Sequence, residues 1–367
     1  MHLFVSCPPK LESLLTEELT SLNIPARKWP RGVSVPLSME NVYRVNLESR
    51  LATRVLWPMK TFSCTSRETL YQEALAIEWE KWLPPASTFA IDANVTGSEA
   101  FKNSHFAALV IKDAICDYFR EKTGTRPSID IASPTVQFNF FLYQDRATLS
   151  FDTSGPPLFK RGYRASTIDA PLQETLAAAI LKLAQYTAHD ILCDPFCGSG
   201  TLLFEAAMIA SSTPPSAFRR AWGFFHHPDF SKDAFDALFP THCTLIRPYT
   251  LIGGDRDSKA IDACRATQSR TQFPIYFERT DIRLFRPPQM PTLVVTNPPY
   301  GVRLKNAEDP YLALAHFLNT TCQGRAAAAV LSPFPHLPRI FKGKMLRPIP
   351  LVNGGLDVFL HLIEATS

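Results

Sequence analysis

The stretch DILCDPFCGSGTLLFEAAMIA, residues 190–210, contains a short apolar strand, a glycine turn and an apolar helix in immediate succession. Glycines at 198 and 200 permit backbone conformations that other residues avoid, and they let a ligand approach the backbone closely. The helix that follows has free N–H groups in its first turn. A plain tight turn is the simplest interpretation of these glycines, and a ligand-binding loop is the alternative.

The second half of the chain repeats this strand-then-helix rhythm. Further apolar runs occur at TLIGGD (250–255), IYFERTD (275–281), TLVVTN (292–297) and AAAAVLS (326–332). Continuous apolar strands separated by helical segments predict a parallel α/β sheet with helices on both faces. The final runs, MLRPIPLV and LDVFLHLIE, flank Asn353-Gly354-Gly355, which is a strong hairpin signal. We therefore expect the last strand to be antiparallel.

Three successive strands of this predicted sheet end in an acid, namely Asp194, Asp255 and Asp281. Ligands of open α/β sheets bind beyond the carboxyl ends of the strands. An acid at the second strand end suits ribose hydroxyls, and one at the third can accept from an adenine amine. Each aspartate alone is more often a cap or turn residue, but the three together favour a nucleoside site. The loop lacks the lysine of a phosphate loop, and Leu203 breaks the dinucleotide glycine spacing.

The stretch TNPPYGVRL, residues 296–304, follows the fourth strand. Its diproline fixes the backbone, so the side-chain oxygen of Asn297 and the carbonyl of Pro298 can point at one spot. Two such acceptors suit an exocyclic amine, whose nitrogen becomes a better nucleophile when both hydrogens are held. Tyr300 offers a ring on which a flipped base can stack. The alternative is a proline-rich turn with an exposed tyrosine.

The first half of the chain alternates short strands and helices and predicts small α+β domains. The segment 105–124 has the periodicity of an amphipathic helix that stops at Gly124. The segment 135–155 alternates as two strands about a turn near Gln144.

A connector, GPPLFKRGYR (155–164), joins the two halves and contains Lys160, Arg161 and Arg164. Local composition favours a solvated linker. The functional alternative is a hinge whose basic side chains contact RNA phosphates.

The totals describe an ordinary globular chain, with 46% hydrophobic and 20% charged residues. A net charge of +4 is too small to indicate nucleic-acid binding by itself. The eight cysteines form no CxxC pair, so we expect reduced thiols and neither disulfides nor a metal site. No run reaches the roughly 18 apolar residues of a membrane helix. We expect a cytoplasmic protein without membrane or metal partners.

With DPFCGSG, Asp255, Asp281 and NPPY in order, the second half resembles class I S-adenosylmethionine-dependent methyltransferases of the NPPY type. That resemblance implies a Rossmann-like, mostly parallel seven-stranded sheet with an antiparallel last strand. It implies that DPFCGSG holds the methionine end of the cofactor, Asp255 its ribose and Asp281 its adenine. Residues 297–300 would hold the target amine.

Flanking motifs extend the resemblance over nearly the whole chain. LFKRGYR, APLQETLAAAILK and RRAWGF resemble, in order, the bacterial guanine-N2 RNA methyltransferases. FVSCPPKLESLLTEEL and FKNSHFAALVIKDAI resemble that family's ferredoxin-like segment and THUMP RNA-binding domain. The likeness is closest to the catalytic module of the large-subunit (23S) rRNA enzymes. It implies a ferredoxin-like segment at 1–46, a THUMP domain at 47–155, a linker at 156–169 and a methyltransferase domain at 170–367.

The resemblance also implies residue roles. The catalytic group would be Asn297, Pro298, Pro299 and Tyr300. The cofactor contacts would be Glu174, Thr175, Asp194, Phe196, Gly198, Gly200, Asp255, Arg256, Asp281, Ile282 and Asn297. The RNA contacts would be Lys160, Arg161, Arg164 and Arg303.

One position departs from the family, because Val302 stands where members often have an acid. The expected reaction is methyl transfer to guanosine N2 in 23S rRNA, with no second activity in these residues. The alternatives are a tRNA guanine-N2 methyltransferase, an adenine-N6 methyltransferase and a non-catalytic RNA-binding assembly factor.

Overall fold

The computed structural model describes residues 1–84, 86–165, 172–238, 248–299, 309–337, 340–341 and 343–366. The chain forms two compact units. Unit 1 contains residues 1–6, 16–158 and 220–239, and unit 2 contains residues 7–15, 159–219 and 240–367. Among the described residues, no helix is long and apolar enough to cross a membrane.

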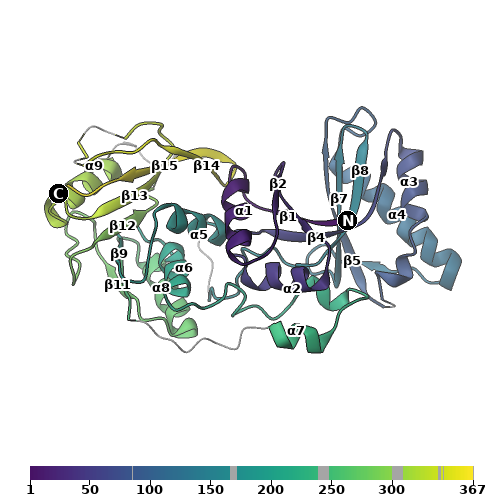
Figure 1. The fold of residues 1–367 in the computed structure, drawn as a ribbon, viewed down its shortest axis with the longest axis horizontal. Coiled ribbons are helices and arrows are strands. Elements are labelled where there is room, and N and C mark those ends of the chain that lie inside the picture. Colours follow the sequence, from purple (N-terminus) through teal and green to yellow (C-terminus); the bar gives the residue numbers. More distant parts are fainter. Residues whose placement is uncertain are drawn as a thin grey trace. The chain divides into compact units, whose positions relative to one another are not determined.

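Unit 1 is built on an eight-stranded sheet in the order β2-β3-β1-β4-β8-β7-β5-β6. Its strands are β1 (His2–Ser6), β2 (Arg27–Trp29), β3 (Gly32–Pro36), β4 (Arg54–Ser63), β5 (Thr88–Thr96), β6 (Ser128–Ile129), β7 (Val136–Tyr143) and β8 (Arg146–Asp152). Its helices are α2 (Met39–Glu48), α3 (Arg67–Leu75), α4 (Ser104–Thr123) and α7 (Lys232–Leu238), with short turns η1 (Trp79–Lys81) and η2 (Gly223–His226). Figure 1 shows α3 and α4 beside strands β5, β7 and β8 of this sheet. Helix α1 (Glu12–Ser21) has residues in both units.

The core of unit 1 lies between the sheet and helices α3 and α4. Helix α4 begins at its cap Asn103, whose side chain accepts from the His105 amide, and ends at Gly124 in the left-handed conformation. Alternate residues of β7 are buried with one stripe of α4: Phe138, Phe140, Leu142, Ala107, Ile111 and Ile115. The predicted helix and the predicted alternating hairpin are both confirmed.

Unit 2 contains the predicted doubly wound sheet, in the order β11-β10-β9-β12-β13-β15-β14. Its strands are β9 (Ile191–Asp194), β10 (Thr250–Asp255), β11 (Tyr276–Arg279), β12 (Leu293–Thr296), β13 (Ala327–Ser332), β14 (Ile349–Asn353) and β15 (Leu356–Ile363). Its helices are α5 (Glu174–Leu183), α6 (Thr201–Ala210), α8 (Ser258–Thr271) and α9 (Asp309–His316), continued by η3 (Phe317–Thr321). Strands β9 to β13 pair in parallel, and β15 is antiparallel to both of its neighbours. The predicted α/β class and the antiparallel end of the sheet are confirmed.

Strand β9 is the point where the sheet order reverses, since β10 lies on one side of it and β12 on the other. Such a switch point leaves a crevice beyond the carboxyl ends of the two central strands.

The two units interleave along the chain. Residues 220–238 lie within the stretch predicted as the methyltransferase domain, but they pack in unit 1. There Phe224 is fully buried, with its ring 5.2 Å from that of Tyr43 and 5.4 Å from that of Phe235.

Candidate active site

The glycine loop, residues 195–200, connects β9 to α6. Gly198 and Gly200 both have positive φ, 51° and 77°. A Cβ on Gly200 would lie 3.0 Å from the Phe204 ring and 3.1 Å from the sulfur of Cys264, so both neighbours would have to shift to accept it. The loop is therefore held in a backbone conformation that favours glycine, as the sequence predicts.

Asp255 at the end of β10 ties this loop to the next strand. Its Oδ2 accepts from the Gly198 amide at 2.9 Å, and its Oδ1 accepts from the Asp257 amide at 2.9 Å. A carboxylate has about four lone-pair sites, so each oxygen can still accept another hydrogen bond. Asp255 is thus both a support for the loop and a free acceptor facing the crevice.

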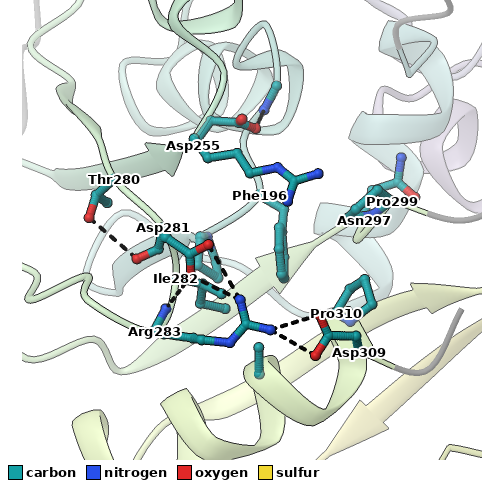
Figure 2. A pocket seen from close by; sticks show the side chains of 14 residues that line it. Phe196, Asp255, Thr280, Asp281, Ile282, Arg283, Asn297, Pro299, Asp309 and Pro310 are labelled. Carbon is teal, nitrogen blue, oxygen red and sulfur yellow. Dashed lines mark hydrogen bonds and ion pairs between the residues drawn. The ribbon is translucent and has the colours of Figure 1, made fainter. Parts of the chain in front are cut away.

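Asp281, which follows β11, is the third of the acids predicted at strand ends. Its Oδ1 accepts from the backbone amide of Arg283 at 3.0 Å. The guanidinium of Arg283 lies between two carboxylates, 3.4 Å from Asp281 Oδ2 and 2.7 Å from both oxygens of Asp309 (Figure 2). Arg283 therefore joins Asp281 to Asp309, the first residue of α9.

Asp194, at the end of β9, is buried rather than exposed to the crevice. It is 1% exposed, and its Oδ1 accepts from Thr296 Oγ1 at 2.6 Å and from the Phe196 amide at 3.2 Å. Burial raises the pKa of the Asp194 carboxyl to about 7, and the nearby Asp255 acts in the same direction. The side chain links the ends of β9 and β12.

Asn297 follows β12 on the same rim. Its Oδ1 is buried and has no hydrogen-bond partner among the described residues. A buried acceptor left without a donor is costly, which suggests that a donor arrives with a ligand. Pro298 is buried and Pro299 exposed, while Tyr300 and Arg303 lie outside the described residues.

These rim residues enclose a cavity of about 270 Å³. Figure 2 shows Asp255 and Asp281 on one side, Asn297 and Pro299 on the other, and Phe196 between them. Of the residues predicted from the sequence, the cavity is lined by Phe196, Gly198, Asp255, Arg256, Asp281, Ile282, Asn297 and Pro299. Its further lining residues are Pro195, Thr280, Arg283, Asp309, Pro310 and Ala313.

Four predicted cofactor contacts do not line this cavity: Glu174, Thr175, Asp194 and Gly200. Glu174 is buried and accepts from Arg164, while Thr175 is fully buried and its hydroxyl has no partner among the described residues.

Two charged residues that line the cavity, Arg283 and Asp309, were not predicted, because little in the sequence marks them. Arg283 stands two residues beyond an acid that the pattern had already selected, and Asp309 is the first residue of a helix.

The basic connector differs most from expectation. Lys160 is exposed, as an RNA contact requires. Arg161 is only 2% exposed and forms an ion pair with Glu205, at 3.5 Å. The Arg164 side chain is 15% exposed and forms an ion pair with Glu174, at 2.6 Å. The expected phosphate contacts at Arg161 and Arg164 are therefore not supported, because their guanidinium groups face buried carboxylates in unit 2.

Comparison with known protein families assigns the chain. Residues 161–360 match the RMKL-like methyltransferase domain, residues 64–152 the THUMP domain and residues 2–56 the RlmL ferredoxin-like domain. The chain belongs to the RMKL-like methyltransferase family. The predicted family and fold class are confirmed.

Individual relatives agree with this assignment. The chain is 38% identical over 373 residues to a protein of Syntrophotalea carbinolica named ribosomal RNA large subunit methyltransferase K/L, covering 96% of the chain and 52% of the relative. It is 34% identical to a putative RNA methyltransferase of Synechocystis, covering 98% of the chain and 96% of that protein. The chain thus spans about half the length of the K/L relatives. The crystal structure of SMU.472, a putative methyltransferase complexed with SAH, superposes with a TM-score of 0.86 at 23% identity, covering 100% of this chain and 98% of that one.

Proposed function

We propose that the chain transfers a methyl group from S-adenosylmethionine to the exocyclic N2 amine of a guanosine in 23S rRNA. The observation that carries the proposal is the buried Oδ1 of Asn297 beside the cavity, which has no hydrogen-bond partner in the part of the chain that the structure describes. An amine donor is the partner that this oxygen lacks.

The residues of the cavity fit the cofactor. Asp255 presents carboxylate oxygens that retain acceptor capacity after binding two amides, which suits the ribose hydroxyls. Gly198 lines the cavity and has no side chain, so a ligand can approach its backbone closely. Asp281 and Ile282 lie together at the far side, where an acceptor and an apolar surface suit an adenine. When bound, the cofactor supplies an electrophilic methyl group on a sulfonium.

The chain's own contribution to the chemistry is to hold the amine. Asn297 Oδ1 accepts one N–H, and the Pro298 carbonyl is the second acceptor of the proposal. With both hydrogens held, the nitrogen lone pair faces the methyl group. No strong base is required, because the nitrogen loses a proton after it becomes cationic. Positioning and fixed dipoles then account for most of the rate enhancement.

RNA as the substrate is supported by the names of the relatives and by the THUMP match over residues 64–152. The large subunit is the substrate named for the K/L relatives, of which the chain spans about half. Guanine N2 rests on the ordered motifs of the sequence and on the acceptor pair at residues 297–298.

The test is nucleoside mass spectrometry of fractionated rRNA and tRNA from cells with and without the protein. Loss of N2-methylguanosine from large-subunit rRNA supports the proposal. Loss of N2-methylguanosine from tRNA alone would make tRNA the substrate. Loss of N6-methyladenosine would make adenine the target base. In vitro, Asn297→Ala should lower the transfer rate by about 100-fold, whereas the matched control Asn94→Ala, at an exposed position of β5, should not. Full activity of Asn297→Ala would refute the amine-holding role.

A further inference from the structure

The segment of residues 161–164, taken from sequence as a basic linker, packs along the first turns of α6. Arg161 forms an ion pair with Glu205, and the ring of Tyr163 lies 5.6 Å from that of Phe204. Gly162 has no space for a side chain, because a Cβ there would lie 2.4 Å from the carbonyl oxygen of Phe218. The segment is therefore a fixed part of unit 2.

Arg164 is the residue of this segment that reaches the glycine loop. Its Nη1 donates to Ser199 Oγ at 3.0 Å, and its Nη2 donates to Thr201 Oγ1 at 2.8 Å. These two partners flank Gly200, the left-handed cap of α6. One planar group thus holds both sides of the residue at which the loop becomes a helix.

The same guanidinium also fixes the start of α5. Its Nε donates to Glu174 Oε1 at 2.6 Å, and its Nη2 donates to the Leu172 carbonyl at 3.1 Å. Glu174 is the first residue of α5, so Arg164 joins the N-terminus of one helix to that of another. Behind it, the Ala165 amide donates to Thr267 of α8 at 3.3 Å, which holds the backbone of the segment.

We propose that Arg164 is a positioning residue that sets the glycine loop for cofactor binding. The inference rests on the proposed function, because it assigns the cofactor to the cavity beside this loop. A rigid planar fork is suited to the task, since it binds Glu174, Ser199 and Thr201 in one fixed geometry. A lysine has one ammonium on a flexible stem and cannot reproduce that geometry.

Arg164→Lys is the informative variant. It leaves a positive charge beside Glu174, so the buried carboxylate is not left uncompensated as it would be in Arg164→Ala. We expect S-adenosylhomocysteine to bind Arg164→Lys about tenfold more weakly in calorimetry, with a similar rise in KM for S-adenosylmethionine. The KM for RNA should not change.

The matched control is Arg161→Lys. Arg161 is the other buried arginine of the segment, and its ion-pair partner Glu205 lies a turn beyond the loop. Arg161→Lys should lower the melting temperature without changing the affinity for S-adenosylhomocysteine. Ser199→Ala should weaken binding in the unaltered chain but add little to Arg164→Lys, because the bond that it removes is already lost.

Other outcomes would overturn the inference. A rise in KM for RNA alone would make Arg164 an RNA contact, and a lower kcat or melting temperature with unchanged cofactor affinity would make it structural only. If the unaltered chain binds no S-adenosylhomocysteine, the proposed function fails and the inference falls with it. Unaltered binding by Arg164→Lys, with normal binding by the parent chain, refutes the inference alone.

Discussion

The hydroxyl of Thr296 donates to the carboxylate of Asp194 at 2.6 Å and so joins the ends of β12 and β9 beneath the cavity. Strand β9 is the point where the sheet order reverses, and β12 is one of its two neighbours in the sheet. This buried contact therefore adds to the backbone pairing of β9 with β12, and it ties the acid before the glycine loop to the strand that precedes Asn297. The geometry of the two halves of the site depends on it.

Stability should depend on pH through this carboxyl. Burial raises the pKa of Asp194 from 3.8 to about 7, so the folded chain retains a proton that the unfolded chain releases. The stabilisation is complete below about pH 4 and is lost as pH rises through 7, at up to ~1.4 kcal/mol per pH unit. Urea unfolding of the parent chain and of Asp194→Asn, at several pH values, isolates the contribution of this carboxyl to the free energy of unfolding. Identical pH profiles for the two chains would contradict it.

Asp255 should contribute to ligand affinity more than its neighbour does. Asp255→Asn replaces one acceptor oxygen with a donor and weakens the contact to the Gly198 amide. We expect a loss of about 1.5–3 kcal/mol in binding S-adenosylhomocysteine, the range for hydrogen bonds to charged groups. The control is Asp257→Asn, which caps α8 through the Lys259 amide and should leave affinity unchanged. Equal affinities for the two variants would remove Asp255 from the binding site.

Gly200 should be far less tolerant of substitution than Gly124, although both are left-handed residues at a helix end. Alanine at either position pays about 1–2 kcal/mol for the positive φ. Only at Gly200 does the new Cβ also meet neighbours, Phe204 and Cys264, at 3.0 and 3.1 Å. Gly200→Ala should therefore lose more stability than Gly124→Ala in chemical denaturation, and it alone should lose cofactor affinity. Equal losses of stability would show that the packing contacts are unimportant.

The sequence predicted the sheet of unit 2 well because its signals are local. Apolar runs, glycine turns and acids at strand ends each stand within a few residues of one another, and Asp255, Asp281 and Asn297 all line the cavity. Burial of Arg161 was not predicted, because its partner Glu205 is 44 positions away in the chain (205 − 161). A signal did exist, since Glu205 is the one acid within the otherwise apolar TLLFEAAMIA. A lone acid on an apolar helix implies a distant cation.

The placement of residues 220–238 in unit 1 could not be read from the sequence, because only long-range packing determines it. Phe224 is fully buried among aromatic rings that include Tyr43, Phe230 and Phe235, and its amide donates to the Thr153 carbonyl at 2.8 Å. Phe224→Ala should cost about 3–5 kcal/mol, the range for deleting a buried phenylalanine. The adjacent Phe225 is 37% exposed, so Phe225→Ala should cost less.

Hydrogen exchange identifies which unit responds to the change at Phe224. Local contacts set local opening, so amides of β4 and β8 should exchange faster in Phe224→Ala. Amides of β9 and β10 should keep their protection, although Phe224 lies between α6 and α8 in the sequence. Faster exchange confined to β9 and β10 would mean that the segment belongs to unit 2 in solution.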